Sequence, residues 1–493
     1  MLDMERLQYR SQFVLGPDFV DRLTSWKKIR IGNDKCLTVH PDLKTCQAIS
    51  KGKSVTLLGY ILDPNNPNDS DTDVVNKLSH KIFNGDEPYF GLTYDFGGRW
   101  ILIIEDGKEP ILMNDPGGLR QVVYTEKNST KEFWCASQPV IIAEILNLKM
   151  DDDAVRFINS FKEKDDEYYW VGDSTPYKEV KQLLPNHFLK LNKGSCSRYW
   201  PDKAFERISL DEGTKKSSRY LEGLMISASK RYNLILSLSS GLDSRLLLAA
   251  SRKIKDKISC LTEIKNYMNV EHADVKIPSK LLPKLGIAHD IVESPTEIMN
   301  DRFNDIFHKN VPFAHEKWAL KAEVYFNRYN LEMVDVIGTV SDIAKFGYDY
   351  FIFNDGAVTL EKLSECVRLQ NDGFALTQLE RWIKEIGDIY NYSIPDLFYW
   401  EQRIGRWAST NYLEFDVGWQ DIFAPYNCRT LLITMLSVDA KFRIPPKYTI
   451  CEKMIRNLWP EVLSQPINPH RGKGSLLKRI KRKLVRLKQN ITN

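Results

Sequence analysis

The chain has 493 residues, enough for two or three domains that each bury a hydrophobic core. Apolar residues make up 43% and charged residues 27%, which excludes a disordered chain, and no apolar run is long enough to span a membrane. The first residues, MLDMERLQYR, lack the apolar segment of a signal peptide. The eight cysteines form no C-x-x-C pair, so neither a zinc cage nor a disulfide framework is indicated, and a reducing cytoplasm is favoured.

The formal net charge of +4 combines two unlike parts of the chain. Residues 471–493 hold nine Lys and Arg and no acid, so without these nine charges the value becomes −5. A mildly acidic body argues against a general nucleic-acid surface, and no nucleic-acid partner is expected.

Residues 1–205 are predicted to be mostly β-structure, with short strands separated by turns rich in Gly, Asn and Asp. The polar run 63–69 is predicted to be a solvated loop, because its acidic residues lack the Gly and the terminal Glu of an EF-hand. The strand candidates are 54–62, 100–105, 109–114 and 121–125.

Residues 206–470 begin with a βαβαβ pattern, which predicts a parallel sheet with crossover helices. Ligands of such sheets bind at the carboxyl ends of the strands. His272 and His289 are interpreted as a helix-start residue and a loop residue rather than as catalytic groups. The expected elements are strands at 234–238, 257–262 and 286–292 and helices at 245–250 and 270–285.

The first predicted strand of this sheet ends in a loop of small residues at 239–244. A strand, a tight loop and a helix N-terminus together favour an anion, because backbone N–H groups converge there and the helix dipole is positive. The loop has no lysine of the G-x-x-x-x-G-K-[ST] kind, so it is not a Walker loop. A plain strand–loop–helix junction is the alternative. The residues concerned are Ser239, Ser240, Gly241, Leu242, Asp243 and Ser244.

This loop resembles the S-G-G-x-D-S loop of the ATP pyrophosphatases, with Ser240 in place of the first Gly. The resemblance implies that the loop binds the β- and γ-phosphates of ATP and that Asp243 holds Mg²⁺. It also implies cleavage of ATP between the α- and β-phosphates, which yields AMP and pyrophosphate.

A second segment, 334–348, resembles the motif S-G-E-G-x-D-E-x-x-G-G-Y of the asparagine synthetases. Gly338 matches the Gly after the strand, and Asp342 matches the Asp that joins Asp243 on Mg²⁺. Thr339 replaces the family's Glu, and Lys345 adds a cation to the loop and is a candidate catalytic residue. These departures put asparagine synthesis in doubt without removing ATP binding.

The last third is predicted to be helical and aromatic, and its polar side chains either line a pocket or pair structurally, as in 398–407. Residues 448–460 resemble the helix that carries the family's intermediate-stabilising Lys, and Lys453 is the candidate for it. The alternative is a surface Lys, since the spacing to Arg456 is one residue short.

Most of residues 50–201 resembles the glutaminase domain of the asparagine synthetases, on the segments 97–107, 114–124, 133–146 and 172–201. Active members carry a Cys directly after the initiator Met, whereas position 2 is Leu here. Cys36 has no free amine and cannot replace that residue. The resemblance therefore implies an α/β protein in which a degenerate Ntn-hydrolase-like α+β sandwich (1–205) precedes a Rossmann-like ATP-pyrophosphatase domain (206–470) and a basic tail (471–493).

Together these features predict an ATP-dependent amide-forming ligase without glutaminase activity, with ATP and Mg²⁺ as cofactors. The expected partners are a small carboxylic acid or sugar acid, with a uronic acid of surface-polysaccharide biosynthesis favoured, and ammonia or an amine as donor. Asparagine synthesis and lactam or peptide cyclisation are alternatives. A nucleotide-binding scaffold without catalysis is an alternative of another class.

Residues 475–493 are predicted to form a basic amphipathic helix. Its apolar residues recur at three- and four-residue spacing among Lys and Arg, which favours reversible contact with an anionic membrane at its inner face. A solvated tail or a nucleic-acid patch is the alternative. The apolar residues are Leu476, Leu477, Ile480, Leu484 and Leu487.

Overall fold

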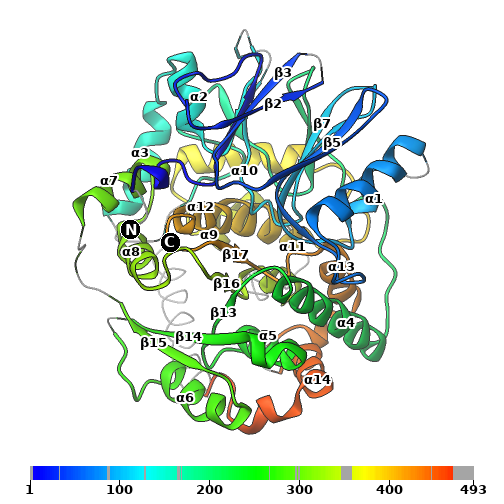
Figure 1. Cartoon of the computed structure of the whole chain (residues 1–493), viewed down its shortest axis with the longest axis vertical. Coiled ribbons are helices and arrows are strands. Elements are labelled where there is room, and N and C mark those ends of the chain that lie inside the picture. The colour runs from blue at the N-terminus through cyan, green and yellow to red at the C-terminus, as the bar shows by residue number, and fades with distance from the viewer. Residues whose placement is uncertain are drawn as a thin grey trace, which may run out of the picture.

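The computed structural model describes residues 4–469, except 33, 86–88, 127–128, 131, 164–166, 168, 266, 295–296, 298–299, 346–352, 354–357 and 446. The predicted amphipathic helix at 475–493 lies outside the described residues. Three β-sheets organise the described part of the chain. In Figure 1 the first two lie in the upper part of the molecule, and most of the third lies in the lower part.

The first two sheets are antiparallel and have six strands each. One has the order β10 (Val180–Gln182), β8 (Val123–Thr125), β9 (Cys135–Ala136), β1 (Phe13–Gly16), β3 (Lys35–Val39), β2 (Lys27–Ile31). The other has the order β12 (Ser195–Arg198), β11 (His187–Lys190), β7 (Ile111–Asn114), β6 (Gly97–Glu105), β5 (Lys53–Leu62), β4 (Thr45–Ser50).

Alternation along β6 explains how these sheets are layered. Ile101 and Ile103 face the other sheet and pack with residues such as Leu15 and Leu37. Trp100 and Leu102 point the opposite way, into a core that includes apolar residues of α1 (Asp71–Asn84). Side chains alternate between the faces of a strand, so one strand serves both cores.

A helix covers the outer face of each antiparallel sheet. A capping box of Ser70 and Asp73 starts α1, and α2 (Pro139–Leu146) packs on β8 and β9 through residues such as Ile141. The order of layers is therefore helix, sheet, sheet, helix. Assignment of these layers to the Ntn-hydrolase class, and the boundary at residue 205, stay predictions.

The third sheet is parallel and has the order β15 (His289–Glu293), β14 (Ile258–Ile264), β13 (Leu234–Ser237), β16 (Val334–Val336), β17 (Asp421–Phe423). The mixed α/β prediction with a parallel sheet is confirmed. The chain first moves from β13 to one side of the sheet and later returns to β16 on the other side, so the strand order reverses between these two neighbours.

The remaining helical elements surround this sheet and the space between it and the antiparallel sheets (Figure 1). The α-helices are α3 (Asp152–Glu163), α4 (Leu210–Ser229), α5 (Leu242–Ala250), α6 (Ala273–Leu285), α7 (Asp301–Asn310), α8 (Glu316–Tyr329), α9 (Leu360–Val367), α10 (Gly373–Glu385), α11 (Ile394–Phe398), α12 (Ser409–Phe415), α13 (Arg429–Ser437) and α14 (Thr449–Leu458). The 3₁₀ helices are η1 (Met4–Leu7), η2 (Gly91–Thr93), η3 (Arg252–Lys257), η4 (Thr339–Lys345), η7 (Ala440–Phe442) and η8 (Pro460–Ser464), and η6 (Tyr399–Ala408) is a π-helix.

Buried polar contacts join the antiparallel sheets to the last third of the chain. The Arg99 guanidinium donates to both carboxylate oxygens of Asp416, at 2.5 and 3.0 Å, and to Asp421 at 3.1 Å. Arg120 donates to the other oxygen of Asp421 at 2.9 Å. Arg99 and Asp416 are both almost fully buried, so their charges depend on each other for solvation.

Among the described residues, no helix combines the length and the apolarity needed to cross a bilayer.

Candidate functional site

Two loops meet at the carboxyl edge of the parallel sheet, one after β13 and one after β16. Because the strand order reverses between these strands, this edge is the position at which open parallel sheets bind ligands. The loops approach each other closely at Gly338, where an added Cβ would lie 2.8 Å from the Cβ of Asp243. The predicted loop at 239–244 and the predicted motif around Gly338 and Asp342 are therefore brought together.

Hydrogen bonds within the first loop fix its shape. The Ser239 amide donates to Ser244 Oγ at 3.1 Å, and the Gly241 amide donates to Ser239 Oγ at 3.0 Å. The amide and hydroxyl of Ser240 both donate to Asp274 Oδ1, at 3.0 and 2.5 Å. Asp274 was not predicted to belong to the site. Its contact with Ser240 exists only because the fold places the start of α6 beside the loop, which the sequence alone does not show.

Ser240 fits in place of the family's Gly because the loop does not use the left-handed backbone region. Gly241 has φ −71°, and Ser240 is not among the residues with positive φ. Small residues are needed here for close approach rather than for backbone freedom.

Helix α5 begins directly after this loop with Gly241 as its N-cap. No side chain of the described residues caps the helix, so the N–H groups of its first turn remain available for an anion. Leu242, Asp243 and Ser244 form that first turn, so the helix begins three residues before the predicted start at 245 and the predicted loop at 239–244 is shorter. The first turn of α5 thus provides N–H donors beside the two loops.

The Lys345 ammonium lies between the two predicted metal-binding carboxylates. It pairs with Asp243 and, at 2.9 Å, with Asp342. The Lys345 side chain is 6% exposed, whereas those of Asp243 and Asp342 are 33% and 46% exposed. Burial disfavours the charged form of Lys345, but the two carboxylates outweigh burial and raise its pKa. Lys345 is therefore a fixed positive charge.

Aromatic residues enclose this charged cluster. The Tyr399 hydroxyl donates to Asp342 Oδ2 at 3.4 Å, and Lys345 Nζ lies 5.8 Å from the centre of the Tyr448 ring. Burial raises the pKa of the nearby Cys451 thiol to about 12, so this cysteine is not a thiolate at neutral pH. The sequence indicated polar groups among aromatics at 398–407 but did not place Tyr399 beside Asp342.

A Mg²⁺ ion shared by Asp243 and Asp342 does not fit the site with Lys345 in this position. The ammonium occupies the point between the carboxylates and would repel a divalent ion strongly at such short range. The described residues contain no group of three or more His, Cys, Asp and Glu that could hold a metal. Binding of Mg²⁺ by both carboxylates requires Lys345 to move away and stays a prediction.

Lys453, the other predicted catalytic lysine, has a different environment. It lies on α14 with its side chain 43% exposed, and its ammonium pairs with Asp211 at the start of α4. The structure thus brings Lys345, and not Lys453, onto Asp243 and Asp342. A catalytic role for Lys453 stays a prediction.

A buried carboxyl group lies on the strand that leads to this site. Ser237 Oγ, at the end of β13, donates to Asp335 Oδ1 of β16 at 2.7 Å. Burial raises the pKa of Asp335 to about 7. No motif in the sequence marks Asp335, which stands between two valines of the strand.

Cys36, the mid-chain cysteine of the first half, lies buried in β3. Its thiol donates to the Pro17 carbonyl at 3.2 Å and accepts from Arg30 at 3.1 Å. These contacts give the buried Cys36 thiol a structural role.

No family model matches the chain, and no curated protein matches it. Among solved structures it is similar to a glutamine-dependent NAD⁺ synthetase from Acinetobacter baumannii, at 13% identity over 40% of this chain and 43% of that one, with a TM-score of 0.20. An NH₃-dependent NAD synthetase from Campylobacter jejuni matches at 17% identity over 36% of this chain and 83% of that one, with a TM-score of 0.20.

A glutamine phosphoribosylpyrophosphate amidotransferase from B. subtilis matches at 9% identity over 59% of this chain and 87% of that one, with a TM-score of 0.23. The chain spans less than half of the Acinetobacter structure. TM-scores this low show neither a shared fold nor a shared function, and the geometry of the chain itself is the basis for a functional proposal.

Proposed function

We propose that the chain is an ATP-dependent amide-forming ligase of the asparagine-synthetase-like kind. One observation carries the proposal: the loop at 239–244 and the loop around Asp342 meet at the point where the parallel sheet reverses its strand order. Such a point is a ligand crevice, and an uncapped helix start beside it favours phosphate.

In the proposed reaction a substrate carboxylate attacks the α-phosphate of ATP, and the bond to the β-phosphate breaks. The products of this step are an acyl-adenylate and pyrophosphate. The N–H groups of the first turn of α5 and the hydroxyl of Ser239 bind the leaving pyrophosphate, while both donors of Ser240 stay on Asp274. Ammonia or an amine then attacks the acyl carbon, and AMP leaves with the bonding electron pair.

Exchange of labelled pyrophosphate into ATP, measured across a panel of carboxylic acids, tests the proposal. With a suitable acid, exchange should occur and the products should be AMP and pyrophosphate. Asp243→Asn and Asp342→Asn should each lower the exchange rate about 100-fold or more, as removal of one electrostatic group from an active site does. Exchange that survives both changes, or formation of ADP and phosphate, would overturn it.

A nucleotide-binding scaffold without catalysis is the second candidate. It is favoured by Lys345, which pairs with both carboxylates, and by Thr339 in place of the family's Glu. The scaffold predicts nucleotide binding with no AMP release under any substrate condition, so product analysis separates the two functions.

The identity of the acceptor and donor belongs to the same proposal. A uronic-acid sugar of polysaccharide biosynthesis is the favoured acceptor, and free ammonia or an amine is the donor, because Leu2 stands where a glutaminase has its Cys. Release of glutamate from glutamine by the purified chain would contradict this assignment of the donor.

We also propose that the basic segment 471–493 brings the enzyme to an anionic membrane surface. Each basic residue near such a surface contributes about 1 kcal/mol of attraction, which salt screens. The full chain should therefore sediment with anionic liposomes at low salt, and a chain ending at His470 should not. Equal sedimentation of both chains would contradict the contact.

A further inference from the structure

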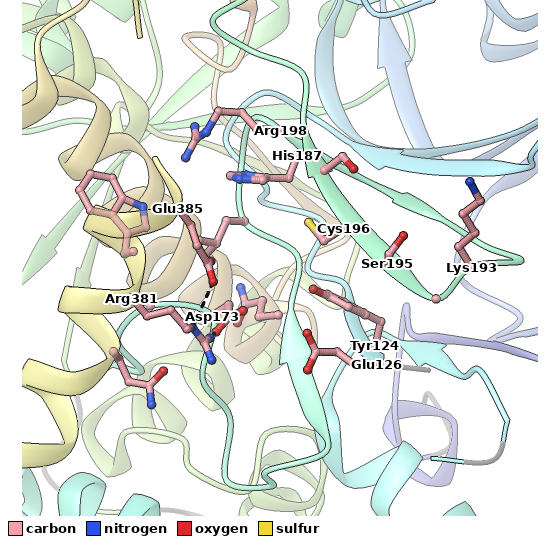
Figure 2. Close-up of a pocket in the computed structure, with 17 residues that line it drawn as sticks. Tyr124, Glu126, Asp173, His187, Lys193, Ser195, Cys196, Arg198, Arg381 and Glu385 are labelled. Atoms are coloured by element: carbon pink, nitrogen blue, oxygen red, sulfur yellow. Dashed lines mark ion pairs between the residues drawn. The ribbon is translucent and has the colours of Figure 1, made fainter. Parts of the chain in front are cut away.

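A cavity of about 490 Å³ lies on the side of the molecule where the edges of the two antiparallel sheets face α10. Figure 2 shows its lining residues, which come from β8 and β10 of one sheet, from β11 and β12 of the other, and from α10. The volume is in the range of small-molecule sites. The cavity is separate from the two loops that form the candidate nucleotide site, because its lining includes no residue of either loop.

The charges around this cavity are balanced. Three acidic and three basic side chains line it, so neither an anion nor a cation is favoured by net charge. This balance argues against a nucleotide or a free phosphate as ligand. The charged lining residues are Glu126, Asp173, Glu385, Lys193, Arg198 and Arg381.

On the helix side these charges already have partners within the protein. Arg381 pairs with Asp173 and lies 3.9 Å from Glu385. Arg198 binds both oxygens of Glu401, a fully buried residue of η6, with one contact at 3.0 Å. These side chains hold one another in place and form the helix side of the cavity.

On the strand side two opposite charges have no ion-pair partner among the described residues. Glu126 follows β8, and Lys193 lies in the turn between β11 and β12. Figure 2 shows both on the side opposite Arg381, with Ser195 on the same side. A ligand with one ammonium and one carboxylate would complement this pair.

The cavity contains a cysteine and a histidine but is not built for nucleophilic catalysis. Burial raises the pKa of the Cys196 thiol to about 12, and burial together with Arg198 lowers the pKa of His187 to about 4. Both groups are therefore neutral at physiological pH. His187 Nδ1 contacts the Pro185 carbonyl at 2.8 Å, and this bond also fixes the ring. The neutral groups serve as hydrogen-bonding partners rather than as a catalytic pair.

Aromatic stacking does not explain the cavity either. Tyr124 and Trp382 line it, but they are only 3% and 4% exposed, so neither offers an open ring face. Stacking platforms are the usual means of holding a nucleobase. By contrast, β10 and β12 are edge strands, and the outer side of an edge strand presents unpaired backbone N–H and C=O groups, which suit a peptide-like ligand.

We propose that this cavity binds a small zwitterion, an α-amino acid or a dipeptide, with its ammonium on Glu126 and its carboxylate on Lys193. The proposal stands on the charge pattern and the edge strands of the cavity, and it is independent of the proposed nucleotide chemistry.

Binding to the full-length chain is measured by saturation-transfer NMR and then by calorimetry, with the twenty standard amino acids and glycylglycine as probes. At least one probe should bind, and its N-acetyl and amide derivatives should each bind about tenfold more weakly or worse, because each lacks one charge-assisted contact. Failure of every probe to bind, or equal binding of the blocked derivatives, would overturn the proposal.

Two variants and two controls then locate the binding probe. Glu126→Gln and Lys193→Gln should each weaken its binding about tenfold or more. Neither side chain is in an ion pair among the described residues, although Glu126 partly offsets the burial that lowers the pKa of Lys181. Glu132→Gln and Lys190→Gln remove similar charges from nearby residues that do not line the cavity, and they should leave the affinity unchanged. Unchanged affinity in both cavity variants would place the probe elsewhere and overturn the proposal.

Discussion

Lys345 places one positive charge at the point where the family motif places a divalent cation. Its sequence position marks it as an addition to the motif, but its contact with Asp243 joins residues about a hundred positions apart. Only the parallel pairing of β13 and β16 brings them together. The positive charge of a buried lysine between two carboxylates also stabilises both negative charges when water is excluded from them.

Replacement of Lys345 by Met should make nucleotide binding more dependent on Mg²⁺. Without the ammonium, Asp243 and Asp342 face each other uncompensated and can share the ion. The ratio of nucleotide dissociation constants without and with Mg²⁺ should rise about tenfold or more, which corresponds to about 1.4 kcal/mol.

Lys345→Arg, which keeps the charge, is the matched control and should leave the ratio near that of the unchanged chain. Titration of a fluorescent ATP analogue at several MgCl₂ concentrations measures it. If the ratio in the Lys345→Met variant equals that in the unchanged chain, Lys345 and Mg²⁺ do not compete for the two carboxylates.

At the scale of elements, the strand and helix patterns predicted the first strands of the parallel sheet and the helices between them. The predicted strand at 257–262 is β14, the predicted helix at 448–460 contains α14, and His272 is the N-cap of α6, as interpreted. His289 was interpreted as a loop residue and instead begins β15, one position beyond the turn. Such elements can be predicted from the sequence because the apolar residues of one face recur at a regular spacing along the chain.

Elements whose stability depends on distant partners were not predicted. Strands β1 to β4 lie before residue 51 and were not predicted: β2 is interrupted by charged residues, and β1 has only four residues. The π-helix η6 has no distinct pattern either. Its Glu401 is held by Trp382 of α10 and by Arg198 and Asn186, which are far away in the sequence. π-helices are rare and occur frequently at functional sites, which agrees with the position of Tyr399 beside Asp342.

The buried Asp335 of β16 should make stability fall as pH rises towards neutrality. Its pKa is about 7 in the folded chain against 3.8 for an ordinary Asp, so folding favours the protonated form. The stabilisation from the raised pKa of Asp335 is fully present below pH 4 and is lost progressively between about pH 4 and 7. Above that range this group causes no further change in stability. The loss is up to about 4 kcal/mol.

Asp335→Asn removes this titration, so the difference in free energy of unfolding between the unchanged chain and the variant should shrink and then reverse as pH rises. Urea unfolding followed by tryptophan fluorescence at pH 5, 6, 7 and 8 measures the difference. Asp211→Asn, at an exposed position, is the control and should give a difference without this slope. A flat difference for Asp335→Asn would contradict the burial argument.

At the scale of the whole molecule, the ion pairs of Arg99 join the antiparallel sheets to the last third of the chain. Arg99→Met should lower the free energy of unfolding by about 3–5 kcal/mol, because among the described residues it leaves Arg120 as the remaining ion-pair partner of the buried carboxylates of Asp416 and Asp421.

Lys253→Gln is the control, since Lys253 forms an exposed pair with Glu222, and its cost should be less than about 1 kcal/mol. Denaturant unfolding followed by fluorescence and by circular dichroism measures both variants. A cost for Arg99→Met no greater than that for Lys253→Gln would show that the buried pairs do not hold the two parts together.

The contacts of α5 with the end of the described chain bear on how the protein matures during synthesis. The buried Arg245 side chain donates to the carbonyls of Val462 and Gln465, and the Asn468 amide donates to the Ser240 carbonyl at 3.0 Å. The loop at 239–244 is therefore fixed by residues that are translated more than two hundred codons later. A nascent chain that has not been extended through 462–468 lacks these contacts, so the proposed ATP binding should be acquired only after residue 468 has left the ribosome.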